Sequence, residues 1–167
     1  MVSNVITPDF FLDIVVSEQR LAIVDKGLAI RSYPVSTAKN GIGEKRGSEC
    51  TPAGWHKVRA KIGSDLPLNS VFIGRRPTGE IYDEALAKQY PGRDWILTRI
   101  LWLGGLEAGK NRYGDVDTCW RYIYIHGTPD EQTIGSPASH GCIRMKNDDI
   151  MDLFDRVGVG VKVVIRE

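Results

Sequence analysis

The first third of the chain is a succession of short β-branched segments separated by turn signals. Residues 12–17 read LDIVVS, residues 20–25 read RLAIVD, and LAIRSYPVSTA follows the turn DKG at 25–27. Connections this short join antiparallel neighbours, so the pattern predicts a meander of β-hairpins. A chain that begins in this way is expected to form a mainly β fold.

Further strand signals follow at wider spacing. A strand starts within residues 51–60 (TPAGWHKVRA), and WILTRILWLGG at 95–105 predicts a long buried strand that ends at glycines. The segment RYIYIHG at 121–127 alternates, so Tyr124 and His126 are expected to share one face with Tyr122.

Near the C-terminus the period of the apolar residues changes from two to that of a helix. Ile150, Leu153, Phe154 and Val157 follow helical spacing, and Asn147 is suited to an N-cap. The segment VGVKVVI then predicts a closing strand. These signals predict a mainly β, single-domain fold with one or two short helices, over residues 1–167.

Residues 61–94 are the least readable part of the chain. The stretch TGEIYDEALAKQY holds at most one short helix with a weak apolar face. We therefore expect residues 74–94 to be an insertion or a lid over a site.

Charge and composition bear on the class of partner. Apolar residues make up 42% of the chain, and 22 basic residues nearly balance 21 acidic ones, so no nucleic-acid or anionic membrane partner is expected. No apolar run is long enough to span a bilayer. The N-terminal segment lacks the layout of a secretory signal, which favours the cytoplasm; the alternative is the periplasm or cell envelope, had a signal been removed. No cofactor is expected.

The most reactive stretch is SPASHGCIRM at 136–145, which places Cys142 two residues after His140. A cysteine attacks as its thiolate, and a nearby imidazole can take the proton. His140 would lie about 7 Å from Cys142 in extended backbone, which is long for a hydrogen bond. His126 ends a well-patterned strand and precedes Gly127, which lets another segment approach, so His126 is the better base.

Two neighbours of Cys142 suit acyl transfer. Gly141 permits the dihedral angles that turn backbone amides toward a developing oxyanion. Arg144 lies two residues past the cysteine, and its forked cation suits a substrate carboxylate. We expect Ser139 and Tyr124 to contribute to substrate binding as well.

Other interpretations of these residues remain open. A lone cysteine is often buried filler, and Cys50 and Cys119 are interpreted in that way. Two histidines and a thiol can also hold zinc, although no CxxC or HxxxH pair is present and no metal site is predicted.

Taken together, these motifs resemble a known family. The segments IHGT and SHGCIRM, with PVSTA and TPAGWH upstream and NDDIMDLFDRVGVGVKVVI downstream, are similar to the L,D-transpeptidase catalytic domain, the YkuD-like family. The likeness covers residues 12–60 and 95–166. It implies a β-sandwich-like catalytic fold, in which Cys142 is the nucleophile and His126 the base, oriented by the Gly127 carbonyl. An alternative of another class is a non-catalytic module that binds wall peptides, against which the intact Cys142 and its histidines argue.

The resemblance also implies the remaining roles and the substrate. His140 and the amides of Gly141 and Cys142 would shape the oxyanion site, and Arg144 would hold a substrate carboxylate. The substrate would be a peptidoglycan tetrapeptide or muropeptide, cleaved between meso-diaminopimelate and the terminal D-alanine. Since no envelope segment is seen, we expect an L,D-carboxypeptidase that trims tetrapeptides to tripeptides in wall recycling. The alternative is a transpeptidase that forms cross-links or exchanges D-amino acids.

Overall fold

A computed structural model describes residues 6–167 of the chain. The first five residues, part of the segment interpreted above for a secretory signal, lie outside the described residues. The described part is mainly β with two α-helices, as predicted. In chain order its elements are β1 (Phe10–Val15), β2 (Arg20–Asp25), β3 (Leu28–Pro34), β4 (Gly54–Ile62), β5 (Ser70–Ile73), β6 (Arg76–Ile81), α1 (Glu84–Gln89), β7 (Ile96–Gly105), β8 (Tyr124–Gly127), β9 (Ile143–Met145), α2 (Asn147–Arg156) and β10 (Lys162–Arg166).

The predicted N-terminal meander is present. β1 pairs antiparallel with β2 and β2 with β3, and Asp25 and Leu28 face each other across a two-residue turn. The turn residues Lys26 and Gly27 both have positive φ, at 49° and 80°, which matches the right-handed twist of the strands. The β-branched runs therefore form the hairpins that their spacing indicates.

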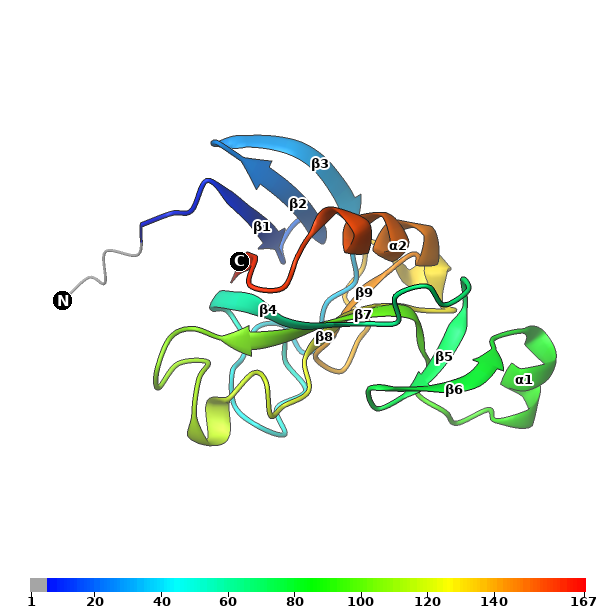
Figure 1. The fold of residues 1–167 in the computed structure, drawn as a ribbon. Helices are drawn as coiled ribbons and strands as arrows, with labels where there is room; N and C mark the ends of the chain where they lie inside the picture. Colours follow the sequence, from blue (N-terminus) through cyan, green and yellow to red (C-terminus); the bar gives the residue numbers. More distant parts are fainter. Residues whose placement is uncertain (1–5) are drawn as a thin grey trace.

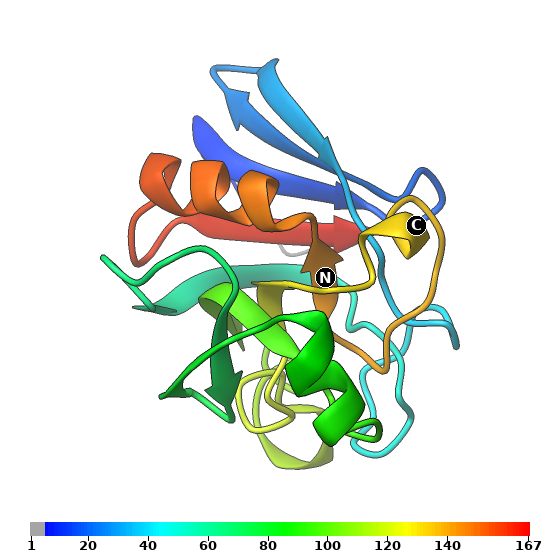
Figure 2. The ribbon, with the colours of Figure 1, turned by 90° about the vertical axis from the view of Figure 1, so that its right-hand side faces the viewer.

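The ten strands join in one mixed sheet, in the order β3-β2-β1-β10-β4-β7-β5-β6, with β8 and β9 continuing from the other edge of β7. The C-terminal strand β10 is inserted between β1, to which it is parallel, and β4. Figure 2 shows α2 lying between β1–β3 and β4, so the sheet bends around the helix. This bend gives the sandwich-like shape.

One apolar core fills the space inside the bend. Leu12 and Ile14 of β1, Leu103 of β7 and Ile143 of β9 are fully buried in it together with residues of α2. The buried side of α2 consists of Ile150, Leu153 and Phe154, at the predicted helical spacing. Burying such side chains contributes about 1.5–3 kcal/mol each, which fixes α2 and the loop before it against the sheet.

Two local predictions were wrong. Asn147 is the first helical residue rather than the N-cap, a position taken by Lys146 without a side-chain bond. The Asn147 side chain instead donates to the Thr128 carbonyl at 2.8 Å, because it is buried against β8. Tyr122 has a φ of 57° and precedes β8, so it does not continue the strand of Tyr124 and His126.

The unreadable segment contains a hairpin and a helix. β5 and β6 pair with each other, α1 follows, and β5 also pairs with β7 through Phe72 and Ile96. Figure 1 shows this unit projecting from one end of the molecule. The short α1 has no buried residue, which explains its weak sequence signal.

Candidate active site

The hydroxyl groups of the buried residues Thr51 and Ser139 hold the loop that bears Cys142. Gly141 has a φ of 136°, and a Cβ atom there would lie 3.1 Å from Ile123. Thr51 donates its hydroxyl to the Gly141 carbonyl at 2.9 Å, and the Gly141 amide donates to the Ser139 hydroxyl at 3.2 Å. Ser139 in turn donates to the carbonyl of Cys142. Glycine is therefore required for a tight turn that presents Cys142 just before β9.

The Cys142 thiol lies between two backbone groups of the segment that enters β8. The Tyr124 amide lies 3.3 Å from the sulfur and points its hydrogen at it, and the thiol lies 3.5 Å from the Tyr122 carbonyl. Cys142 also packs against a small apolar cluster of Phe72, Ile100 and Tyr124. An amide aimed at sulfur favours the thiolate, whereas the apolar packing favours the thiol.

His126 occupies the middle of β8 and is buried. Its Nδ1 lies 2.7 Å from the Gly127 carbonyl, so a proton on Nδ1 leaves Nε2 unprotonated. Gly127 lets α2 approach, since a Cβ atom there would collide with the Asn147 side chain and lie 2.7 Å from the Leu97 carbonyl. The ring is thus fixed by its strand and by the start of α2.

Parallel pairing of β8 and β9 brings the two halves of the site together. Ile125 is opposite Ile143 and His126 is opposite Arg144. Cys142, which immediately precedes β9, therefore lies beside the strand that holds His126. Among residues 6–167 no hydrogen bond joins the Cys142 thiol directly to His126. Proton transfer between them therefore requires a small approach or a bridging water.

A cavity of about 190 Å³, here called the thiol cavity, contains most of the predicted site residues. Its walls include Cys142, His126, His140, Ser139 and Arg144. The ring of Tyr124 is buried in the apolar cluster instead, and this residue reaches the site through its amide. Sequence reasoning missed the other residues of the wall, which are Asp94, Arg121, Tyr122 and Ile123.

Arg144 is one of two arginines in the wall of the thiol cavity, the other being Arg121, and its side chain is only 14% exposed. Its Nη2 lies 3.8 Å from a carboxylate oxygen of Asp94, whose side chain is 73% exposed. Asp94 follows α1, in the segment that the sequence left unreadable, so no pattern indicated it. Arg144 thus has an exposed and weakly bound acidic partner at the wall of the thiol cavity.

Burial sets the protonation of the two central groups. It lowers the pKa of His126 to about 4, although the nearby Gly127 carbonyl acts in the opposite direction. It raises the pKa of the Cys142 thiol to about 11, against the Tyr124 amide and the charge of Arg144. Both groups are therefore neutral at pH 7, as a thiol and an imidazole.

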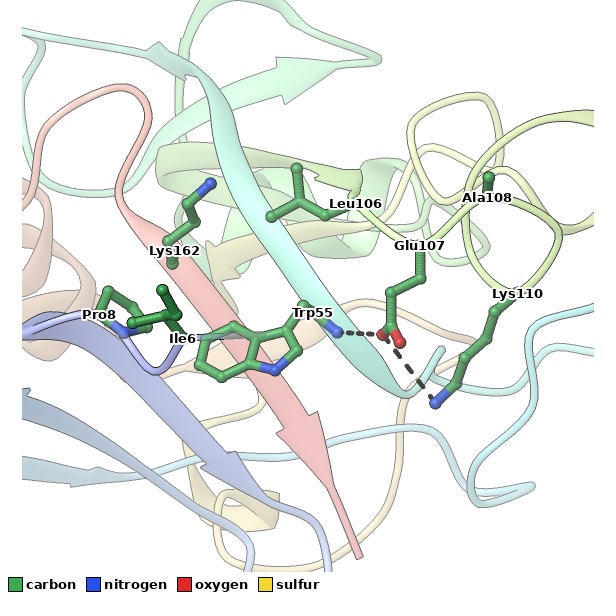
Figure 3. A pocket seen from close by; sticks show the side chains of 8 residues that line it. All are labelled: Ile6, Pro8, Trp55, Leu106, Glu107, Ala108, Lys110 and Lys162. Atoms are coloured by element: carbon green, nitrogen blue, oxygen red, sulfur yellow. Dashed lines mark hydrogen bonds and ion pairs between the residues drawn. The ribbon is translucent and has the colours of Figure 1, made fainter. Parts of the chain in front are cut away.

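Another cavity, of about 590 Å³, lies elsewhere and shares no residue with the thiol cavity. Figure 3 shows Trp55 and Lys162 on one side and Glu107 and Lys110 on the other. Glu107 accepts from the Trp55 amide at 2.7 Å, so its carboxylate has a structural partner. Among the described residues its lining includes no cysteine, serine, threonine or histidine, so the candidate thiol chemistry stays with Cys142.

The described residues contain neither a metal-binding cluster nor a membrane-spanning helix. No group of three or more His, Cys, Asp or Glu side chains within 6–167 is arranged to hold a metal ion. No helix in that part of the chain is long and apolar enough to cross a membrane.

Sequence comparison places most of the chain in one family. Residues 9–165 match the L,D-transpeptidase catalytic domain, YkuD. The probable L,D-transpeptidase YcfS of Escherichia coli is 29% identical over 152 residues, which cover 90% of this chain and 42% of that protein. The probable L,D-transpeptidase ErfK/SrfK of E. coli is 53% identical over 45 residues, covering 27% and 14%. The matched part thus spans less than half the length of these relatives.

Solved structures share the fold. An L,D-transpeptidase from Mycobacterium smegmatis superposes with a TM-score of 0.57 at 19% identity, covering 95% of this chain and 59% of that one. L,D-transpeptidase 3 from Mycobacterium tuberculosis, in complex with a faropenem-derived adduct, gives 0.58 at 17% identity and covers 96% and 61%. The family match over nearly the whole chain confirms the resemblance seen in the motifs: the chain belongs to the L,D-transpeptidase catalytic domain family.

Proposed function

We propose that this chain is a cysteine-dependent enzyme that cleaves the bond between meso-diaminopimelate and the terminal D-alanine of peptidoglycan tetrapeptides. We further propose that water resolves the acyl-enzyme, which makes the chain an L,D-carboxypeptidase. The observation that carries the proposal is the thiol cavity, where Cys142, His126 and Arg144 meet. The family membership and the names of the relatives support the class of substrate.

The first half of the reaction is acylation. Arg144 pairs with the D-alanine carboxylate, which displaces the Asp94 carboxylate from its side. Nε2 of His126 takes the Cys142 proton as sulfur attacks the diaminopimelate carbonyl. The C–N bond then breaks, the proton passes to the departing amine, and D-alanine leaves a thioester on Cys142.

The oxyanion needs donors during this step. The Tyr124 amide already points at the sulfur, and the Gly141 amide donates to Ser139 in the free enzyme. We propose that the Gly141 amide turns from Ser139 to the oxyanion, together with the amide of Cys142. Ser139 then keeps its bond to the Cys142 carbonyl and holds the loop in place.

Deacylation by water is favoured by the size of the thiol cavity. At about 190 Å³ it is smaller than the 300–1,000 Å³ typical of ligand pockets. Such a space admits water to the thioester more readily than a second stem peptide. Water attacks the thioester with His126 as base, the C–S bond breaks, and the tripeptide leaves with a new carboxylate.

Transfer to an amine is the second candidate function. The relatives named above are described as L,D-transpeptidases, and the same thioester can be attacked by an amine. In that case the product is a cross-link or an exchanged D-amino acid, and the cell envelope is the place of action.

For the hydrolytic function we propose a cytoplasmic setting, with soluble tetrapeptides from wall turnover as substrates. The three cysteines Cys50, Cys119 and Cys142 are all free thiols, as is usual in reducing compartments. Immunodetection in fractionated cells tests this; recovery with envelope fractions would contradict it.

The mechanism is tested by the mass of the intact protein. Mixing with the tetrapeptide and quenching within one turnover should show an increase by the mass of the tripeptide acyl group, that is, the tripeptide minus one water, and digestion should map it to Cys142. Cys142→Ala should show neither the adduct nor turnover while it keeps the native circular dichroism spectrum. Turnover by Cys142→Ala would refute the proposal.

A further inference from the structure

Next to the thiol cavity, three aromatic rings and two arginines form a cluster linked by cation–π contacts. The Trp102 ring lies between two guanidinium groups, with Arg59 at 5.2 Å and Arg75 at 4.7 Å from its centre. Arg59 also lies 5.8 Å from the ring centre of Trp120, and Arg75 lies 4.9 Å from that of Tyr122. Cation–π contacts of this kind hold the rings in fixed orientations.

Two rings of this cluster, those of Trp120 and Tyr122, are open to solvent. Trp120 is 52% exposed and Tyr122 is 46% exposed, although both are large apolar side chains. Trp102 behind them donates its indole N–H to the Cys119 carbonyl at 3.1 Å and packs edge-on against Trp120. A rigid, exposed pair of rings is more typical of a binding surface than of a core.

These rings line a second cavity, of about 310 Å³, here called the aromatic cavity. It adjoins the thiol cavity, because both are bordered by Arg121, Tyr122, Ile123 and His140. A substrate that lies in one can therefore extend across these shared residues toward the other. Trp120 lies only in the aromatic cavity, away from the thiol.

The charged residues of the aromatic cavity differ in availability. Arg121 is engaged with backbone carbonyls, including that of Cys50 at 2.7 Å and that of Glu44 at 3.0 Å. Arg46 and Glu49 are exposed, and neither side chain has an ion pair among residues 6–167. Beside the aromatic wall, Arg46 suits a carboxylate of a ligand with an apolar face, and Glu49 suits hydroxyl or amide donors of the same ligand.

Because the two cavities adjoin, we infer that the aromatic cavity binds the sugar-proximal half of a muropeptide whose scissile bond lies at Cys142, with a hexosamine ring stacked on Trp120. The inference rests on the proposed function for the identity of the ligand. In a tetrapeptide the lactyl-linked sugar is three residues from the scissile carbonyl, roughly 10 Å or more along the chain. Arg46 then meets the free carboxylate of the γ-linked D-glutamate.

A pyranose is favoured here for a chemical reason. One face of the sugar presents C–H groups with partial positive charge, and these attract the negative face of an aromatic ring. The enzyme should accordingly prefer a disaccharide tetrapeptide over the same tetrapeptide without sugar. The expected preference is about tenfold or more, the size of a single well-packed aromatic anchor.

The test measures binding and turnover in parallel. In the Cys142→Ala background, the dissociation constant of N-acetylglucosaminyl-N-acetylmuramoyl-tetrapeptide should be about tenfold lower than that of the free tetrapeptide. Adding Trp120→Ala should remove most of this difference, and Trp120→Phe should restore most of it. Tyr113→Ala is the matched control, because this exposed ring also faces an arginine but borders neither cavity. It should leave the difference intact.

Three results would overturn the inference. They are equal binding of both ligands, a sugar preference that survives Trp120→Ala, and a tighter, Trp120-dependent binding of the uridine-diphosphate-linked muramoyl tetrapeptide, which would assign the wall to a nucleobase. The same ligands are then given to the Cys142-containing enzyme. If that enzyme turns over neither ligand, the proposed function fails, whereas the binding data still judge the sugar site.

Discussion

At the scale of single residues, burial acts on Cys142 and His126 in opposite directions. It raises the pKa of the thiol to about 11 and lowers that of the imidazole to about 4. A thiolate–imidazolium pair would require the reverse order of these two values. In the free enzyme the proton is therefore on the Cys142 sulfur, and it is transferred to His126 only during the catalytic step.

This protonation state predicts the pH dependence of alkylation. The rate at which iodoacetamide modifies Cys142 should rise about tenfold per pH unit between pH 7 and pH 10, since only the thiolate reacts. Peptide mass analysis separates Cys142 from the other two cysteines. A rate that is already constant near pH 7 would show a preformed thiolate and contradict this account.

At the scale of elements, the position of His126 depends on how closely α2 approaches β8. Gly127 leaves room for Asn147, which bonds to the Thr128 carbonyl and accepts from the Thr98 hydroxyl at 2.6 Å. The sequence indicated that Gly127 permits such an approach. It did not indicate Asn147 as the partner, because an asparagine at a helix start is normally interpreted as a cap.

Gly127→Ala should therefore destabilise the fold by about 1–3 kcal/mol, the usual cost of overpacking, and lower kcat. The new methyl group would collide with Asn147 and with the Leu97 backbone. Urea unfolding and steady-state kinetics measure both effects. Gly92→Ala is the control, since nothing lies within 4 Å of a Cβ atom there. Equal stability of the two variants would contradict the close-approach argument.

Residues 74–94, which contain β6 and α1, are expected to act as a lid. This segment ends at Asp94, which borders the thiol cavity and lies beside Arg144. Because Phe72 and Ile96 already pair across β5 and β7, an Asn-Gly turn can replace residues 74–94 and close a short hairpin. With an amine present, the product ratio should shift from hydrolysis toward transfer as the thioester becomes more accessible. An unchanged ratio, measured by mass spectrometry, would remove the lid from the account.

Elements with strong local signals were predictable, and those formed by distant contacts were not. The β-branched runs 20–25 and 95–105 correspond closely to β2 and β7, and the helical spacing after residue 147 corresponds to α2. The β5–β6 hairpin was missed because β6 is mostly exposed and neither strand alternates. Asp94 lies just before β7 and meets Arg144 because β7 pairs with β8 and β8 with β9, so its position could not be predicted from local pattern.

At the scale of the whole molecule, two buried histidines tie stability to pH. Burial lowers the pKa of His56 to about 4, as it does for His126. His56 is held between the Gly54 carbonyl and the Thr118 hydroxyl, each at 3.0 Å. The unfolded chain takes up protons at these sites near pH 6.5, whereas the folded chain does so only near pH 4.

The free energy of unfolding should consequently be fully retained above pH 6.5 and fall as the pH is lowered toward 4. Each histidine contributes a slope of up to about 1.4 kcal/mol per pH unit in this window. His56→Gln should remove the contribution of His56 to the slope of the free energy of unfolding against pH. His140→Gln, at an exposed histidine, serves as the comparison. Urea midpoints between pH 4 and 7 measure this. A slope identical in His56→Gln and the unmodified protein would contradict the assignment.

The most direct test of the proposed activity is product analysis with the L-Ala-γ-D-Glu-meso-diaminopimelate-D-Ala tetrapeptide, with and without excess D-methionine. Mass spectrometry should find tripeptide and free D-alanine as the main products in both mixtures, and neither with Cys142→Ala. That result would establish hydrolysis through the Cys142 acyl-enzyme. A dominant D-methionine exchange product or cross-linked dimer would instead establish transfer and contradict the carboxypeptidase proposal.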